Sequence, residues 1–194
     1  MMLYRNLLHT QSPIEEINLG MNQLSSLPPE FVTLRSLRSL WLEDNHFEVF
    51  PVELCHLYGL LSLRLQGNRL EAIPDEISSL CNLETLDLSN NEISEFPTAL
   101  LQLSNLRSLW LRQNKLAELP SNLCSLSRLE VLSASSNQLV GIPECLCEMK
   151  ELKKVYVNGN SITSQDDGLP IRLYSHERLE CLNIANNNIG YMQL

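Results

Sequence analysis

The chain has 194 residues, of which 41 are Leu and 18 are Asn, and it carries a formal net charge of −9 at pH 7. Apolar residues make up 44% of the chain, which excludes a disordered protein because burying them offsets the entropy lost on ordering. No run approaches the roughly 20 apolar residues of a membrane span, and the acidic balance disfavours binding to nucleic acid.

The N-terminal segment, residues 1–13, precedes any regular pattern. Apolar side chains at Leu3, Leu7 and Leu8 have the spacing of one face of a short helix. We expect residues 1–13 to form an N-terminal cap that covers the first unit of the fold.

The rest of the chain repeats with a period of 23 residues. Asn recurs at this interval from Asn22 to Asn160 and once more, after a longer interval, at Asn187, while Pro keeps the regular interval from Pro28 to Pro143. Each unit approximates L-x-x-L-x-L-x-x-N-x-L-x-x-L-P-x-x-L-x-x-L. The units begin at residues 14, 37, 60, 83, 106, 129, 152 and 179. Two residue types that stay in phase over six periods define an internal repeat.

The repeat pattern predicts one strand and two turns in every unit. The Leu-x-Leu alternation has a period of two, so a short strand turns both Leu inward and the residue between them outward. The Asn side chain offers acceptor and donor groups to the backbone of the sharp turn that follows. The Pro, with apolar residues three and six places later, predicts a short helix or 3-10 turn on the return path. Because one unit cannot bury its Leu alone, the units must stack.

This pattern resembles the leucine-rich repeat family over residues 14–194. The resemblance implies an α/β solenoid in one domain, residues 1–194. Its form is a horseshoe with a parallel concave β-sheet of about eight strands and short helical or 3-10 convex segments. The L-P-x-x-L segment is similar to intracellular repeats of the Ras-group and Scribble kind, which lack cysteine-rich caps. With no secretory signal at the N-terminus, a cytoplasmic protein is expected.

Residues 161–178 depart from the repeat. They contain four extra residues, and Asp166 stands where the Pro is expected, so we expect an irregular insertion on the return path. Asp166, Asp167 and Gly168 lack the alternating ligands of a calcium-binding loop, which favours a solvated turn.

The final unit is short. It ends seven residues after Asn187, before a return segment can form. An exposed edge strand promotes association, which leaves three alternatives for this edge. Tyr191, Met192 and Leu194 cap it, a partner covers it, or the chain continues in a longer protein.

The second position of the units carries alternating charge. From the fourth unit onward it holds Glu84, Arg107, Glu130, Lys153 and Glu180. Neighbouring strands lie about 4.8 Å apart, so these opposite charges favour the correct stacking register. The column is either an ion ladder that supports the sheet or part of a binding surface.

The fifth position contains both tryptophans. Its residues are Asn18, Trp41, Arg64, Asp87, Trp110, Ser133, Tyr156 and Asn183. Side chains here point away from the Leu core, so burial within the chain does not explain the tryptophans, and Trp, Tyr and Arg dominate binding energy at interfaces. We expect a partner-binding surface formed by Trp41, Glu43, Asp44, Arg64, Asp87, Trp110, Arg112 and Tyr156. The alternative is an internal cation–π stack of Trp41 on Arg64.

Catalysis and metal binding find little support in the sequence. No phosphate-binding loop, metalloprotease motif or hydrolase motif occurs. Cys145 and Cys147 form a C-x-C pair without further zinc ligands, and the six Cys are expected to be reduced and packed. We expect no enzyme activity, cofactor or metal. The histidines fall in separate parts of the pattern, at His9, His46, His56 and His176.

Two functions remain open. The first is a non-enzymatic protein–protein interaction module, a cytosolic signalling adaptor or regulatory subunit that binds a folded partner on the concave face. The family resemblance implies a partner such as a small GTPase or a phosphatase catalytic subunit. The second is a passive structural component of a larger assembly, joined by self-association through an uncapped C-terminal edge.

Overall fold

A computed structural model describes residues 14–164 and 168–190 of the chain. The expected cap at residues 1–13, the expected turn at Asp166 and Asp167, and the expected cover from residues 191–194 lie outside the described residues. Within the described part, no helix has the length and apolar character needed to cross a membrane.

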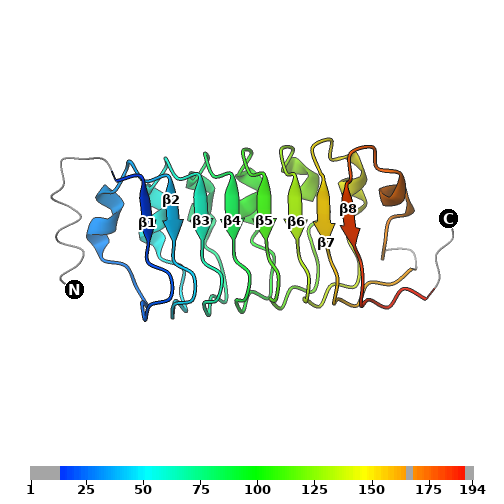
Figure 1. The fold of residues 1–194 in the computed structure, drawn as a ribbon, viewed down its shortest axis with the longest axis horizontal. Coiled ribbons are helices and arrows are strands. Elements are labelled where there is room, and N and C mark those ends of the chain that lie inside the picture. Colours follow the sequence, from blue (N-terminus) through cyan, green and yellow to red (C-terminus); the bar gives the residue numbers. More distant parts are fainter. Residues whose placement is uncertain (1–13, 165–167, 191–194) are drawn as a thin grey trace.

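In the described part of the chain, eight parallel strands form one sheet whose spatial order follows the sequence (Figure 1). Adjacent strands pair unit by unit, so that Leu40 lies beside Leu63 and Trp41 beside Arg64. The strands are short because the alternating segment of each unit ends at the turn that precedes the repeat Asn. Their bounds are Glu16–Asn18 (β1), Ser39–Trp41 (β2), Ser62–Arg64 (β3), Thr85–Asp87 (β4), Ser108–Trp110 (β5), Val131–Ser133 (β6), Lys154–Tyr156 (β7) and Cys181–Asn183 (β8).

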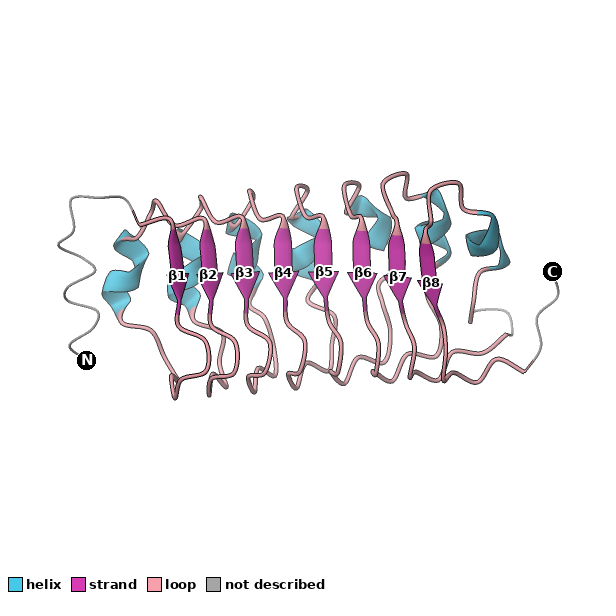
Figure 2. Cartoon of the chain, in the orientation of Figure 1, coloured by secondary structure: helices cyan, strands magenta, loops and turns pink. Residues whose placement is uncertain are grey.

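Residues 14–164 and 168–190 contain seven short 3-10 turns, which line the opposite face of the sheet (Figure 2). A Pro precedes six of them in extended conformation, and in η2 the N–H of Leu54 donates to the carbonyl of Pro51 at 3.1 Å. This confirms the convex segments predicted from the Pro spacing. The turns are Pro29–Thr33 (η1), Val52–His56 (η2), Asp75–Ser79 (η3), Thr98–Gln102 (η4), Leu123–Ser125 (η5), Glu144–Glu148 (η6) and Ile171–Ser175 (η7).

The Leu residues of successive units form one continuous core between the sheet and the turns. Leu63 and Leu86, at the centres of β3 and β4, are fully buried. Leu182 and Ile184, in the last unit, are only partly buried. The predicted solenoid with a parallel sheet of eight strands is therefore confirmed.

The repeat Asn residues join each turn to the preceding unit. The Asn91 Oδ1 accepts a hydrogen bond from the N–H of Leu70 at 2.9 Å. Its Nδ2 donates to the carbonyls of Leu65 and Leu88, each at 3.0 Å. These bonds pair backbone groups that would otherwise be buried without partners, which is the structural role predicted for the Asn ladder.

The residue before each repeat Asn adopts a left-handed conformation, a feature that we did not predict. All eight have φ between 52° and 71°, a region that favours Gly and, less strongly, Asn and Asp. Gly occupies the position in two units only. The eight residues are Met21, Asp44, Gly67, Asn90, Gln113, Ser136, Gly159 and Asn186.

The stretch 161–178 is more regular than the sequence suggested. Pro170 follows Pro143 at the same lengthened interval that separates Asn187 from Asn160, and it precedes η7, so it takes the role expected at position 166. The extra residues are accommodated before η7, where the carbonyl of Gly168 accepts a hydrogen bond from the N–H of Ile142 at 2.8 Å. Within the described residues, the departure from the repeat therefore ends before Pro170.

Candidate functional site

Strand register brings the fifth-position residues into one row across the sheet. Trp41 on β2 pairs with Arg64 on β3, Arg64 with Asp87 on β4, and Asp87 with Trp110 on β5. The row continues through β6 to Tyr156 on β7. Residues that lie far apart in the sequence thus share one face of one sheet.

Trp110 and Tyr156 stack on each other across the intervening strand. Their ring centroids are 6.3 Å apart and their planes differ by 18°. Two strand spacings amount to about 9.6 Å, so the rings lean toward each other over β6. Ser133, which lies between them, is only 3% exposed although it belongs to the same row. Part of each ring is therefore buried within the chain, so contacts inside the chain account for part of the Trp110 surface that we expected burial not to explain.

Trp41 and Arg64 have no such internal partner. The expected alternative, a cation–π stack between them, is not found among the described residues. Trp41 is half-buried and Arg64 is exposed. The Arg64 guanidinium makes no hydrogen bond or ion pair with any described residue, and neither does that of the exposed Arg112 beside Trp110.

Unpaired acceptors lie close to Trp41. The carboxylate of Glu43 packs against Gly20. If Gly20 carried a Cβ atom, that atom would lie only 2.7 Å from the Glu43 Cδ. The Glu43 Oε2 and the Gln66 Oε1 in the next unit are both buried without a hydrogen-bond partner in the described structure. Asp44, the following residue, is exposed and its carboxylate lies over Gly67. Buried acceptors of this kind are costly unless a donor reaches them.

Asp87 has a local structural role in addition to its place in the row. Its Oδ1 accepts a hydrogen bond from the N–H of Ser89 at 2.9 Å. Asn18 caps its own turn in the same way, through the N–H of Gly20 at 2.9 Å. Short polar side chains at this position therefore close the turn after the strand.

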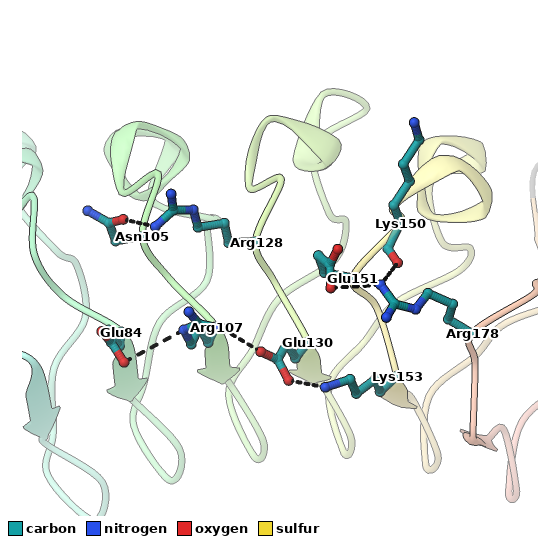
Figure 3. Close-up of polar contacts among 9 residues, drawn as sticks. All are labelled: Glu84, Asn105, Arg107, Arg128, Glu130, Lys150, Glu151, Lys153 and Arg178. Atoms are coloured by element: carbon teal, nitrogen blue, oxygen red, sulfur yellow. Dashed lines mark hydrogen bonds and ion pairs between the residues drawn. The ribbon is translucent and has the colours of Figure 1, made fainter.

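The second-position charges pair into an ion ladder along β4 to β7 (Figure 3). Arg107 lies 3.7 Å from Glu84 and 2.7 Å from Glu130, and Glu130 lies 2.6 Å from Lys153. Hydrogen bonds from Lys153 and Arg107 hold the pKa of Glu130 below its usual value. Glu180 continues the alternation but makes no ion pair with the described residues.

A second row of polar pairs runs beside this ladder (Figure 3). Such contacts between neighbouring units stabilise stacking, each by a few tenths of a kcal/mol. The geometry favours a role for the second-position charges as an ion ladder that supports the sheet, because these charges already form ion pairs within the chain. The pairs of the second row are Asn105 with Arg128 and Glu151 with Arg178.

The described residues contain no cluster of three or more His, Cys, Asp or Glu side chains that could hold a metal ion. The site is instead an open polar and aromatic surface on a rigid sheet. Side chains of this composition bind another macromolecule through contact area and complementary charge.

These features define a repeat solenoid with one open parallel sheet, on which polar and aromatic side chains lie in a row. Residues 27–191 match the sequence profile described as a leucine-rich repeat region. The chain belongs to the leucine-rich repeat family. Family and fold are those of protein-interaction modules, which are typically non-enzymatic.

Several solved structures share this fold. A leucine-rich repeat protein of Leptospira interrogans is 29% identical with a TM-score of 0.83, over 92% of this chain and 50% of that one. Internalin C2 of Listeria monocytogenes is 26% identical with a TM-score of 0.81, over 93% and 75%. The chain thus spans about half the length of the Leptospira protein.

A plant receptor provides a third likeness. The leucine-rich repeat ectodomain of the membrane receptor kinase GASSHO1/SCHENGEN3 from Arabidopsis thaliana is 31% identical with a TM-score of 0.79, over 91% of this chain and 22% of that one. That ectodomain was solved in complex with CASPARIAN STRIP INTEGRITY FACTOR 2. No curated protein sequence matches the chain.

Proposed function

We propose that this protein is a non-enzymatic cytosolic signalling adaptor or regulatory subunit that holds a folded protein partner on its concave sheet. The observation that carries the proposal is that Trp41 and Arg64 lie side by side on the outer face without an internal partner among the described residues. The exposed part of a Trp side chain and an Arg guanidinium without a hydrogen bond or ion pair are groups that a second molecule can bury and pair.

The size of the row suits a protein surface. From β2, which carries Trp41, to β7, which carries Tyr156, the sheet advances by five strand spacings, about 24 Å. A standard protein–protein interface buries about 800 Å² on each side, which corresponds to a patch of similar width. One folded partner can therefore contact the whole row at once.

Charge along the row gives the partner an orientation. Glu43 and Asp44 flank Trp41, where the Glu43 Oε2 lacks a donor in the described structure. Arg112 flanks Trp110 and makes no ion pair with a described residue. A complementary partner presents a Lys or Arg side chain toward Glu43 and a carboxylate toward Arg112. The resemblance of the L-P-x-x-L segments to repeats of the Ras-group kind is the reason to propose a small GTPase or a phosphatase catalytic subunit in this role.

Affinity capture from native extract tests the proposal. The baits are the wild-type chain, a Trp41→Ala/Trp110→Ala variant, an Arg64→Glu variant and a control outside the row, Glu95→Ala, at an exposed position. Arg64→Glu is informative because the exposed guanidinium makes no hydrogen bond or ion pair with a described residue, so its loss should not disturb folding. A partner identified by mass spectrometry should then be purified and its binding measured by calorimetry.

We expect the partner to bind the wild type and the control equally, and Arg64→Glu and the double variant at least about tenfold more weakly, with folding verified by circular dichroism. A tenfold loss corresponds to about 1.4 kcal/mol. Equal binding to all four proteins would show that the concave row is not the interface.

A second candidate is a structural component that associates through the C-terminal edge. Leu182 and Ile184 are only partly buried in the last unit, and this favours association at that end. Sedimentation over a range of concentrations separates the two functions. Self-association that persists in the Trp41→Ala/Trp110→Ala variant supports the structural role, and a monomer at every concentration contradicts it.

A further inference from the structure

Three cysteines lie together on the convex side of two adjacent repeats. Cys124 is in η5, and Cys145 and Cys147 are in η6, the turn that packs on η5. All three are half-buried free thiols. They are separated from the concave row by the Leu core.

Cys124 and Cys145 are in direct contact. The Cys145 Sγ accepts a hydrogen bond from the backbone N–H of Cys124 at 3.2 Å. Burial and a hydrogen bond with the Cys124 side chain raise the pKa of Cys145 to about 11. Because the N–Cα bond is about 1.46 Å, the Cys145 sulfur lies within about 4.7 Å of the Cys124 Cα. The two cysteine side chains are also hydrogen-bonded to each other, so their sulfurs are neighbours.

We propose that Cys124 and Cys145 are an oxidation site at which a hydroperoxide forms a reversible disulfide between adjacent repeats. The Cys124 sulfur is the attacking thiolate, because the raised pKa of Cys145 keeps the Cys145 sulfur protonated; its attack on the O–O bond gives a sulfenic acid on Cys124 and an alcohol or water. The second thiol then attacks the sulfenic sulfur and expels water. Two thiols and one hydroperoxide thus give one disulfide, one alcohol or water from the hydroperoxide, and one further water.

This disulfide would act on the sheet as well as on the convex side. It closes a loop, from residue 124 to residue 145, that contains β6. This strand carries Ser133, beneath the stacked rings of Trp110 and Tyr156. Oxidation would therefore restrain the two repeats that support this aromatic pair.

The remaining cysteines provide internal comparisons. Cys81 is exposed and makes no hydrogen bond with another thiol among the described residues. Cys147 is two residues from Cys145 in the same turn and is the alternative thiol with which a disulfide could form. The proposal therefore requires a specific pairing, and a general sensitivity of thiols to oxidant would not satisfy it.

The test treats the reduced full chain with hydrogen peroxide, blocks the remaining thiols, and maps linked peptides by mass spectrometry without reduction. We expect the Cys124–Cys145 link to be the main intramolecular product. Closing a loop of this length should raise the Tm by roughly 6–12 °C, and dithiothreitol should reverse the shift. Cys124→Ser should abolish both effects, whereas Cys81→Ser should leave both intact.

Several results would overturn the proposal: a dominant link through Cys147, links only between molecules, or oxidation beyond the sulfenic acid without a disulfide. Peptide mapping of the wild type decides the pairing by itself, so a poorly folded Cys124→Ser variant does not prevent the test. In that case Cys145→Ala serves as the second variant and should also abolish the link and the Tm shift.

Discussion

Replacing Asn91 by Ala should cost this protein a large part of its stability. Ala removes the acceptor of the Leu70 N–H and the donor to the carbonyls of Leu65 and Leu88, all of which are buried. An unsatisfied buried N–H costs about 1–3 kcal/mol, and each carbonyl adds about 1 kcal/mol. We expect a loss of about 3–5 kcal/mol, against a total stability of about 5–15 kcal/mol for a typical protein.

Urea unfolding followed by circular dichroism measures this loss. With an m-value of about 2 kcal/mol/M, the midpoint should fall by roughly 2 M. The matched control is Asn22→Ala, the same change at the same repeat position in the first unit, where Asn22 is exposed and bonds the carbonyls of Leu19 and Gly20 at the surface. Its loss should be below about 1 kcal/mol, because water replaces these bonds.

Asn91→Asp separates the acceptor from the donor. Asp keeps an oxygen for the Leu70 N–H but places a second acceptor against the Leu65 and Leu88 carbonyls. It should be as harmful as Ala at pH 7 and partly recover near pH 4, where a protonated carboxyl can donate. Equal losses at Asn91 and Asn22, or full stability of Asn91→Asp at pH 7, would refute this account of the ladder.

Three further predictions concern the turn, the ion ladder and a buried thiol. Gln113→Gly should stabilise the protein by about 0.5–1 kcal/mol, because Gln113 is exposed with φ of 54°; a lower Tm would contradict this. Glu130→Gln should destabilise by less than about 1 kcal/mol at pH 7. The pKa of Glu130 is lowered, mainly by Lys153, so the ion pairs of Glu130 stabilise the protein above pH 4.5. Their contribution to the free energy of unfolding should vanish on acidification or in high salt. Burial raises the pKa of the Cys55 thiol from 9.0 to about 11. The free energy of unfolding should therefore decline between pH 9 and 11, by about 1 kcal/mol at pH 10. In unfolding measured as a function of pH, Cys55→Ala should lack this part of the decline.

Local chemistry made much of the fold predictable. The Leu-x-Leu alternation implies a strand, the Asn implies a hydrogen-bonded turn, and the Pro marks the start of the return segment. Because the interval is constant, the same three elements recur in every unit. The position of Pro170 was predictable in the same way, because its interval from Pro143 equals that of Asn187 from Asn160. The left-handed turn residue was not predictable, since Gln113 and Met21 give no sign of a positive φ.

The candidate site was predictable in membership but not in geometry. The shared fifth position of the repeat placed Trp41, Arg64 and Trp110 on one face, because strand register follows from the repeat length. It did not reveal that Trp110 leans across β6, although the small Ser133 between two aromatic residues was a usable signal. The unpaired oxygen of Glu43 was likewise hidden, because hydrogen bonding depends on side-chain rotamers.

The sequence by itself determined the repeat, the parallel sheet and the face on which each residue lies, because these follow from periodicity and from the backbone chemistry of Leu, Asn and Pro. Only the tertiary structure decided which aromatic side chains and which thiols find partners across units. Trp110 meets Tyr156 and Cys124 meets Cys145, whereas Trp41 and Arg64 have no partner among the described residues. The physical reason is that such contacts depend on side-chain rotation over distances of a few ångströms, which the interval between residues does not encode.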